Sequence, residues 1–433
     1  MIIVCEPQCK GIMHEKVNSG FIYGLRLAYP QEKIIFFADE THISAIKDIL
    51  ENDGVSVVNF ECEPIKFETS SSKIYSFIGV IRYYLLFKKL FNKMCNLGTD
   101  KVFFLSNNPI ILYTIKKLRQ RSQYREIYCT FVLHGEFEDL ARGSQNLIKH
   151  MGATSSQVDG KEDGERFANQ YKKIFIIISK ILLHPVCSLT NIRILFYRRI
   201  FWVKKIMLWQ HSNHYRYIAL SPHIVKNARQ YLDPEYLNFS VVIMPIIYKR
   251  PYPQPENEFI KFAVFGSGDS HQMHMMLSLL SKKEITARYE IKIISADRRG
   301  SENFPNISYV NHGKVLARKE MEKAVPDVDV FINLYDINHH KLGCSLSIFE
   351  ALSYLKPVLH LSNDSYNYFN KADKPIGFRC ENLNDFVDKM YDMIENYSSY
   401  KDKLNTFRNN MQDIRDRYTI ENNIDDLRNS FAF

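Results

Sequence analysis

The sequence predicts an α/β protein built from two doubly wound domains, and three observations predict it. Short β-rich runs alternate with amphipathic segments from end to end, which is the pattern of parallel sheets covered by helices. The chain has 433 residues, enough for two full cores. Pro251, Pro253 and Pro255 interrupt the alternation near the middle, because proline continues neither a helix nor a central strand.

The first half begins directly with a strand, Ile2–Cys5. Amphipathic segments at 41–50, 109–120 and 222–232 are expected to form helices between the strands. The polar stretch 141–170, rich in Gly and Ser, is expected to be a loop or an insertion. The further strands expected in this half are at 33–38, 55–60, 101–106, 126–134, 217–221 and 240–245.

The second half repeats the pattern and ends in polar helical segments from residue 382 onward. Its expected strands are at 261–265, 289–295, 307–311, 328–334 and 357–362. We therefore predict a first domain at 1–247, a proline-rich linker at 248–257, a second domain at 258–410 and a C-terminal helical segment at 411–433.

Composition excludes several classes of protein. The hydrophobic content of 45% is typical of a globular chain rather than a disordered one. The eight cysteines are scattered without a C-x-x-C pair, which favours buried, reduced thiols over a disulfide scaffold or a zinc site. The N-terminus lacks a basic region followed by a long apolar core, so we expect no signal peptide and a cytoplasmic protein.

The net charge of +9 is concentrated in two stretches without acidic residues. The first lies between Glu165 and Asp233 and holds twelve Lys and Arg among aromatic and aliphatic residues; the second lies between Thr69 and Thr99. Neither holds the roughly 18 uninterrupted apolar residues of a spanning helix, so we expect helices lying on an anionic membrane surface. Ordinary domain helices with solvated basic faces are the alternative. Nucleic acid is a weaker one, because no nucleic-acid motif accompanies the charge.

The most informative segment is 343–359, in which a turn of small residues leads into a short helix and Lys-Pro leads into a strand. The N-terminus of this helix, near Ser345, Leu346 and Ser347, offers unpaired N–H groups and a positive dipole end to a phosphate. Glu350, one turn further, can accept hydrogen bonds from vicinal sugar hydroxyls. The alternative is a capping box, in which Ser347 caps the helix and Glu350 reaches back to it.

This segment resembles the donor-site signature of GT-B glycosyltransferases, which reads roughly E-G-x-G-x-S-x-x-E-A-x-x-x-G-K-P-V. The first glutamate of that signature falls on Leu342, and its later glycine falls on Leu355. The resemblance implies two Rossmann-like domains facing each other across a cleft, with the sugar donor on the second domain and the acceptor on the first. It implies no bound metal and no other cofactor. The residues that fall in register are Gly343, Ser345, Ser347, Glu350, Ala351, Lys356, Pro357 and Val358.

Four further residues are candidates for the donor side. Gly266 and Gly268 form a turn after a strand, where the family's loop lies near the phosphates, although a tight turn alone would explain them. Gly313 corresponds to the family's loop near the base. Arg298 follows a strand end and suits a bidentate phosphate contact, with an ordinary surface arginine in a turn as the alternative. The family often carries basic residues after the first of these turns, whereas this chain has Asp269-Ser270-His271 there.

On the first domain, His134 and Glu136 follow a buried strand, at the end where α/β folds place their chemistry. They are the candidate general base or sugar-orienting residues, with ordinary turn polarity as the alternative. His14 and Glu15 occupy the acceptor-side loop after the first strand. His339-His340 and the pair His271 and His274 lack further ligands at metal spacing, so we predict no metal site.

These observations predict a glycosyltransferase that takes a nucleotide sugar and a lipid-linked or glycan acceptor in the synthesis of surface polysaccharide or lipopolysaccharide. We expect it on the inner face of the cytoplasmic membrane as a peripheral protein. A nucleotide-sugar epimerase of the same fold is the nearest rival. A non-catalytic binding protein of a polysaccharide assembly is another, favoured by the lost glutamate at Leu342.

Overall fold

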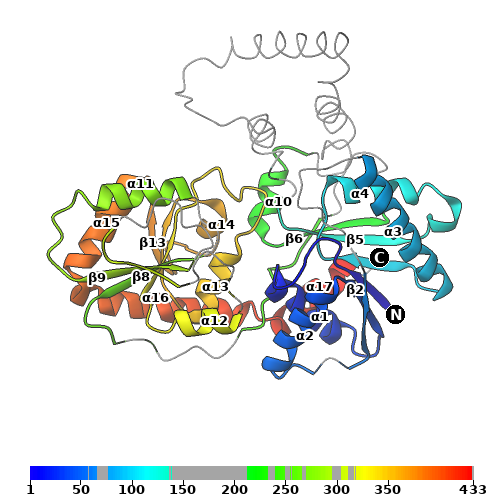
Figure 1. The fold of residues 1–433 in the computed structure, drawn as a ribbon, viewed down its shortest axis with the longest axis horizontal. Helices are drawn as coiled ribbons and strands as arrows, with labels where there is room; N and C mark the ends of the chain where they lie inside the picture. The colour runs from blue at the N-terminus through cyan, green and yellow to red at the C-terminus, as the bar shows by residue number, and fades with distance from the viewer. Residues whose placement is uncertain are drawn as a thin grey trace, which may run out of the picture.

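The structure is a computed structural model that describes residues 1–56, 58–65, 77–135, 138, 212–232, 239–248, 254, 256–265, 270–294, 304–310, 316 and 318–431. These residues form two lobes, each built on one parallel sheet with helices packed around it (Figure 1). The predicted α/β class with two doubly wound domains is confirmed. We refer to the lobe with the N-terminal sheet as the first domain and to the other as the second domain.

Within the described residues, the sheet of the first domain has seven strands, all paired in parallel, in the order β3-β2-β1-β4-β5-β6-β7. Central strands of such a sheet are covered on both faces, which is why Ile2–Cys5 is apolar throughout and fully buried. The strands are β1 (Ile2–Cys5), β2 (Ile34–Ala38), β3 (Phe60–Pro64), β4 (Lys101–Phe104), β5 (Tyr128–Leu133), β6 (Tyr215–Ala219) and β7 (Phe239–Val241).

The strand expected at 55–60 is wrong, because β3 begins only at Phe60. Gly54 and Asn59 have φ of +65° and +54°, which extended backbone does not adopt. Val58 between them is 61% exposed. Val58 and Asn59 therefore lie in a turn, and pairing with β2 starts where Phe60 meets Ile34.

Helices cover both faces of this sheet. The expected helices at 41–50, 109–120 and 222–232 are confirmed as α2, α4 and α10. Their starts follow from capping: the Asp39 carboxylate accepts from Thr41 N–H at 3.0 Å, and Asn108 accepts from Ile111 N–H at 2.9 Å with a proline next to it. The helices are α1 (Glu15–Ala28), α2 (Glu40–Asn52), α3 (Phe77–Asn96), α4 (Pro109–Leu118) and α10 (Pro222–Ala228).

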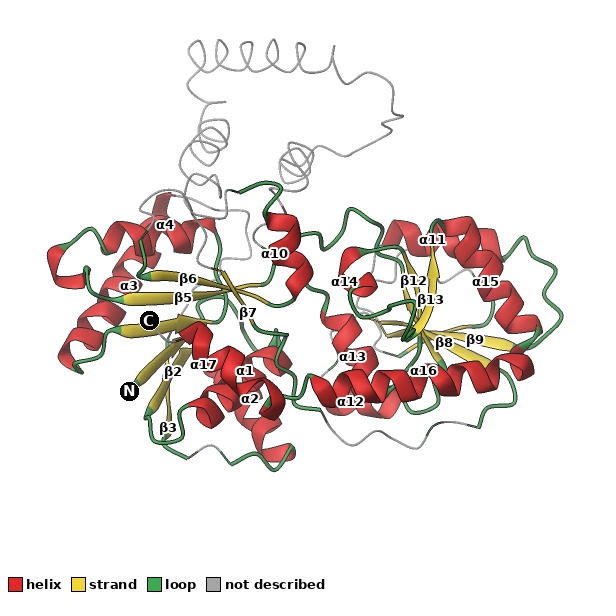
Figure 2. Ribbon diagram, turned by 180° about the vertical axis from the view of Figure 1, so that it is seen from behind, coloured by secondary structure: helices red, strands yellow, loops and turns green. Residues whose placement is uncertain are grey.

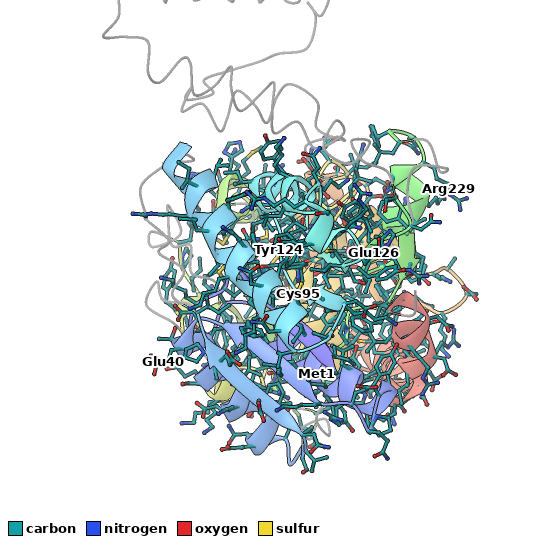
Figure 3. The ribbon with its side chains drawn as sticks, turned by 90° about the vertical axis from the view of Figure 1, so that its right-hand side faces the viewer. Met1, Glu40, Cys95, Tyr124, Glu126 and Arg229 are labelled. Carbon is teal, nitrogen blue, oxygen red and sulfur yellow. The ribbon has the colours of Figure 1, made fainter. Side chains whose placement is uncertain are left out.

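Figure 3 shows the side of the first domain that faces away from the second, where Tyr124 and Cys95 lie near each other. The Tyr124 hydroxyl, in the short turn Ser122–Tyr124, donates to the side-chain oxygen of Asn92 on α3. Cys95 donates to the Gln123 carbonyl at a sulfur–oxygen distance of 3.7 Å. These contacts fix the C-terminal end of α3 against the turn that leads into β5.

The sheet of the second domain has six described strands in the order β10-β9-β8-β11-β12-β13, again all parallel. The sequence analysis missed β13, a four-residue edge strand that includes the exposed Arg379 and so lacks an apolar run. The strands are β8 (Ile260–Phe265), β9 (Tyr289–Ile294), β10 (Ile307–Tyr309), β11 (Val330–Asn333), β12 (Val358–Leu361) and β13 (Gly377–Cys380). The helices are α11 (Ser270–Leu280), α12 (Arg318–Ala324), α13 (Leu346–Tyr354), α14 (Asp364–Asn367), α15 (Leu383–Glu395) and α16 (Tyr397–Arg417).

One apolar cluster runs through both domains. It joins the α1 and α2 face of the first sheet to α13 of the second domain through residues 242–246. Gly20 on α1 permits this contact, because a Cβ there would lie 1.9 Å from the Pro245 carbonyl oxygen. The faces turned away from the interface have separate clusters, one under α3 and α4 and one under α11 and α15.

The end of the chain returns to the first domain (Figure 1, red helix among the blue ones). Helix α17 (Ile424–Phe431) packs against α1, and the Phe431 ring lies 5.7 Å from Tyr29 and 5.6 Å from Phe103 between ring centroids. Residue 410, the predicted end of the second domain, lies inside α16. Figure 2 shows α16 running along the second domain toward this return.

Several sequence predictions fall outside the described residues. These are the polar stretch 141–170, most of the basic stretch after Glu165, and most of the proline-rich linker. Among the helices that the structure describes, none is long and apolar enough to cross a membrane.

Candidate functional site

Each sheet has one switch point, where the strand order reverses. It lies between β1 and β4 in the first domain and between β8 and β11 in the second. In doubly wound folds, ligands bind outside the carboxyl ends of the strands at such points. The predicted site residues that the structure describes follow strand ends in these regions, and they meet at the contact between the domains.

Helix α13 begins with Ser345 as its N-cap, whose hydroxyl accepts from the Ser347 N–H at 3.3 Å. The capping box that we considered for Ser347 and Glu350 is therefore wrong. Ser347 is the second residue of the helix, and Glu350 reaches across to the first domain instead of back to the cap. Leu346 is the first helical residue, so Ser345–Ser347 forms the helix N-terminus as predicted.

Hydroxyl groups link this N-terminus to the neighbouring strands. The Ser347 hydroxyl bonds the Ser345 hydroxyl at 2.6 Å and the Tyr366 hydroxyl at 2.7 Å, and it accepts from the Asn333 amide at 3.3 Å. The Ser365 hydroxyl accepts from the Ser345 N–H at 3.3 Å. This network holds the helix start rigidly with neutral groups, and it leaves the positive end of the helix dipole uncompensated by an anion among these contacts.

The two departures from the family signature have structural roles. Leu342, at the position of the first glutamate, is buried in the apolar cluster of the first domain. Its N–H donates to the Glu138 carboxylate at 2.7 Å, so a carboxylate from the other domain lies beside this position. Leu355, at the position of the glycine, ends α13 with φ of +52°, and its buried side chain offsets the strain of that conformation.

Gly343 brings the two predicted halves of the site together. A Cβ on Gly343 would lie 3.1 Å from the His134 carbonyl oxygen and 3.4 Å from Gly135 Cα. The turn before α13 therefore packs on the segment that follows β5, and a larger residue would push the domains apart. Two side chains of α10 hold the same turn: His223 bonds the Gly343 carbonyl oxygen at 3.0 Å, and Asn227 donates to the Lys341 carbonyl at 2.9 Å.

An ion pair crosses the interface one helical turn further along. Lys16, in the first turn of α1, donates to the Glu350 carboxylate, and the side chains are 9% and 4% exposed, respectively. The sulfur of Met321 on α12 also lies 3.5 Å from the Lys16 ammonium. Glu350 is thus buried at the domain interface with a cationic partner that the sequence analysis did not identify.

The predicted histidines of the first domain lie face to face. The rings of His14 and His134 are stacked with centroids 4.6 Å apart, and His134 Nε2 lies 2.6 Å from the Leu105 carbonyl oxygen. This contact requires a proton on Nε2 of a neutral ring. Burial lowers the pKa of His14 to about 4, and the neighbouring His134 ring lowers it further; burial also lowers the pKa of His134. Both rings are therefore neutral near pH 7.

A fully buried carboxylate, Glu6, lies directly after β1, and its charge acts on both rings. Its oxygens accept from the N–H groups of Gln8 (2.8 Å) and Cys9 (3.0 Å), from the Ser106 hydroxyl, and from the Asn18 amide (3.0 Å). All four donors are neutral. The charge of Glu6 opposes the lowering of the His14 pKa, so it favours a proton on that ring.

Glu15, the other predicted acceptor-side residue, follows His14 at the start of α1. Burial raises the pKa of its carboxyl to about 7, against the opposing effects of the Lys16 charge and of a hydrogen bond from the Arg318 N–H. Glu15 therefore titrates near neutrality at the interface between α1 and α12.

The remaining predicted site residues, Glu136, Gly266, Gly268, Arg298 and Gly313, lie outside the described residues. In the part of the chain that is described, no group of three or more His, Cys, Asp or Glu could hold a metal ion. His339 instead bonds Asp336 at 2.9 Å. The absence of a metal site stays a prediction for the whole chain.

Sequence reasoning missed Glu6, Lys16 and Glu138. Glu6 had a usable signal, since it is a charged residue directly after a buried strand, where polar side chains face the switch point. Lys16 and Glu138 had none, because each acts on a residue of the other domain.

Comparison with known proteins supports the fold. Neither the family models nor the curated proteins gave a match to this sequence. Among solved structures, the lipopolysaccharide outer core galactosyltransferase WaaB in its apo form is similar with a TM-score of 0.55 and 12% identity, over 99% of this chain and 98% of that one. WaaG, a glycosyltransferase involved in lipopolysaccharide biosynthesis, has a TM-score of 0.52 and 11% identity over 100% of both chains. Anabaena Alr3699/HepE in complex with UDP and glucose has a TM-score of 0.52 and 11% identity, over 98% and 97%. These similarities extend over both domains, and the chain has the GT-B fold.

Proposed function

We propose that this chain is a glycosyltransferase that moves a sugar from a nucleoside diphosphate sugar to a lipid-linked or glycan acceptor. The proposal rests mainly on one observation: the N-terminus of α13 and the two stacked histidines lie at the same domain interface. The N-terminus of α13 suits an anion, and the neutral His14 and His134 suit a proton. The GT-B fold, which several glycosyltransferases share at full length, supports it further.

In this proposal the diphosphate of the donor lies at the helix start, Ser345–Ser347, and Glu350 accepts hydrogen bonds from the ribose hydroxyls. Gly266, Gly268 and Gly313 complete the donor site, as the family resemblance implies, and Arg298 adds a phosphate contact because it follows a strand end. We include no metal ion and no other cofactor, because the resemblance implies none.

The transfer itself exchanges one bond for another. A nitrogen of His14 takes the proton of the acceptor hydroxyl, and the acceptor oxygen bonds the anomeric carbon of the sugar. The bond from that carbon to the phosphate oxygen breaks, and its electron pair leaves with the nucleoside diphosphate. The charge that develops on the leaving group meets the N-terminus of α13. His14 suits the role of base because its Nδ1 is buried without a hydrogen-bond partner among the described residues.

We further propose that the acceptor belongs to surface polysaccharide or lipopolysaccharide synthesis and is held in a membrane. The protein would attach as a peripheral protein to the inner face of the cytoplasmic membrane through the basic stretch between Glu165 and Asp233. Two solved relatives by fold act in lipopolysaccharide synthesis, which supports this class of acceptor. Flotation with phosphatidylglycerol vesicles at low salt, and none with neutral vesicles, is the expected result.

The decisive experiment incubates the protein with a panel of UDP, GDP, ADP, dTDP and CMP sugars, with and without membrane extract, and follows product by mass spectrometry. A glycosylated lipid product that requires the extract supports the proposal. Conversion of the donor without extract would indicate an epimerase. Nucleotide binding without any conversion would indicate a non-catalytic binding protein, consistent with the loss of a glutamate at Leu342.

A further inference from the structure

The Lys16–Glu350 ion pair places a cation from the first domain against the predicted nucleotide-binding helix of the second. The two residues are 334 positions apart in the chain, and both side chains are more than nine-tenths buried. In the described part of the chain, Lys16 is the residue that bonds the Glu350 carboxylate. A buried ion pair of this kind is costly to break, because the partner left behind keeps an unpaired charge.

This pair is less completely bonded than the other ion pair across the interface. Arg318 of α12 bonds Asp53 of the first domain, and it also bonds Glu322 at 3.2 Å and the Ile247 carbonyl at 3.3 Å. Lys16 has three N–H donors, but among the described residues it meets only one strong acceptor, since the sulfur of Met321 is a weak one. The lysine therefore retains donors for another anion.

A nucleoside diphosphate can replace both partners of the pair at once. Its ribose hydroxyls can donate to Glu350, and its phosphates can accept from Lys16. After this exchange the ammonium is paired with phosphate and the carboxylate keeps hydrogen bonds from the hydroxyls, so the exchange costs less than simple separation. Glu350 lies one turn, about 5.4 Å, from the start of α13, which is within the sweep of the four-carbon lysine stem.

We propose that Lys16 is a diphosphate ligand supplied by the first domain: the nucleotide takes Glu350 from it, and the freed ammonium neutralises the diphosphate. This inference rests on the proposed function. It also accounts for the lack of basic residues in the sequence Asp269-Ser270-His271, where the family often carries them. The leaving group then gains this additional positive charge only when both domains contact the donor, so domain closure and catalysis are coupled.

The test measures how much the phosphates add to nucleotide affinity. Dissociation constants are measured by calorimetry for the tightest binder among UDP, GDP, ADP, CDP and dTDP, and for the same nucleoside without phosphates. In Lys16→Met, the ratio of the two constants should fall about tenfold or more, because a charged hydrogen bond to phosphate is lost. The affinity for the nucleoside should not fall, because Glu350 is free to bind the ribose. Lys16→Arg keeps the charge and should keep the ratio. Arg318→Met is the matched control, since it removes the other cation of the interface and should leave the ratio unchanged.

Lys16→Met leaves Glu350 buried without its cation, and this variant can fail to fold. The double variant Lys16→Met/Glu350→Gln removes both charges, and it is then compared with Glu350→Gln alone by the same ratio. If the wild type binds nucleotides but the loss of Lys16 leaves the ratio unchanged, Lys16 only holds the domains together. That result would overturn this inference and leave the proposed function standing. A wild type that binds none of the nucleotides would overturn the proposed function as well.

Discussion

The two sides of the domain interface differ in the kind of charge that they can accept. On the second-domain side, hydroxyl and amide groups form a hydrogen-bond network around the start of α13. The members of this network are neutral, and the first charged side chain of the helix is Glu350, one turn further along. The first-domain side has the neutral rings of His14 and His134, on which the charge of the fully buried Glu6 carboxylate acts. The former suits an anion that arrives with the donor, and the latter suits a proton that arrives during the reaction.

This difference separates binding from chemistry. Groups that interact with the donor equally in the ground state and the transition state determine the affinity for the donor. Groups that accept or donate a proton in the transition state determine turnover. Substitutions on the second-domain side should therefore alter nucleotide affinity, and those on the first-domain side should alter kcat. A substitution on either side that changed both affinity and kcat to the same extent would contradict this separation.

The largest effect is expected for His14→Ala. Loss of the general base should lower kcat by roughly 10²–10⁴-fold, while the affinity for the nucleoside diphosphate stays within about threefold. His134→Ala should have the same sign with a smaller effect, because its Nε2 is already committed to the Leu105 carbonyl.

His360→Gln is the control for that prediction. His360 is also buried, and burial also lowers its pKa to about 4, but it bonds the Leu361 carbonyl and Asn370 within the second domain. Steady-state kinetics should show normal kcat for this variant at a temperature where it is folded. An equal loss of kcat in both variants would mean that buried histidines matter only for stability.

The next effect concerns Glu15, and it appears in stability rather than in turnover. Burial raises its pKa from 4.5 to about 7, so the unfolded chain releases the proton first as pH rises. The free energy of unfolding should therefore fall between about pH 4.5 and 7. Glu15→Gln should be more stable than wild type by up to about 3 kcal/mol at pH 8 and equal to it near pH 4.5, as measured by urea unfolding.

The adjacent His14 provides a control of opposite sign. Burial lowers its pKa from 6.5 to about 4, so its effect is to destabilise the fold as pH falls through that range. His14→Gln should gain stability over wild type only on the acid side, and Glu15→Gln only on the basic side. Stability differences that do not vary with pH in either variant would show that burial of these groups has no such consequence.

On the second-domain side, Glu350→Gln should weaken binding of the nucleoside diphosphate about tenfold or more, because charged hydrogen bonds contribute roughly 1.5–3 kcal/mol. Asp53→Asn is the matched control, since it breaks the other ion pair across the interface, to Arg318. That variant should unfold more easily yet bind nucleotide with nearly unchanged affinity, as followed by calorimetry. If both variants lose affinity equally, the effect comes from the domain interface and not from the ribose.

How much of this could be predicted from the sequence depends on the range of the contacts. The start of α13 was predictable because its determinants, Ser345 to Glu350, are local and produce a recognisable turn, cap and helix. The strand ends that carry His14 and His134 were predictable for the same reason. Their stacking was not, because β1 and β5 are separated in the sheet by β4.

Contacts between the domains left no pattern in the sequence. Nothing local to Lys16 indicates that Glu350 is its partner, and nothing near Leu342 indicates that Glu138 lies beside it. The missed strand β13 and the misplaced β3 are both at sheet edges, where one face is less buried and the apolar pattern is weak. Local patterns therefore predicted the two halves of the candidate site, and only the fold shows that they lie together.

The smallest expected effect tests whether the cap of α13 does more than stabilise its helix. Ser345→Ala removes the N-cap and should cost about 1 kcal/mol in unfolding free energy. Asn382→Ala removes the N-cap of α15, where the Asn382 side chain accepts from two N–H groups at 3.0 Å, and it should cost about the same. Only Ser345→Ala should also weaken nucleotide binding, because its hydroxyl fixes Ser347 and thereby orients the N–H groups that meet the phosphates. Thermal unfolding with and without the nucleotide distinguishes the two. If the nucleotide stabilises both variants equally, the Ser345 hydroxyl contributes to the stability of the helix but not to nucleotide binding.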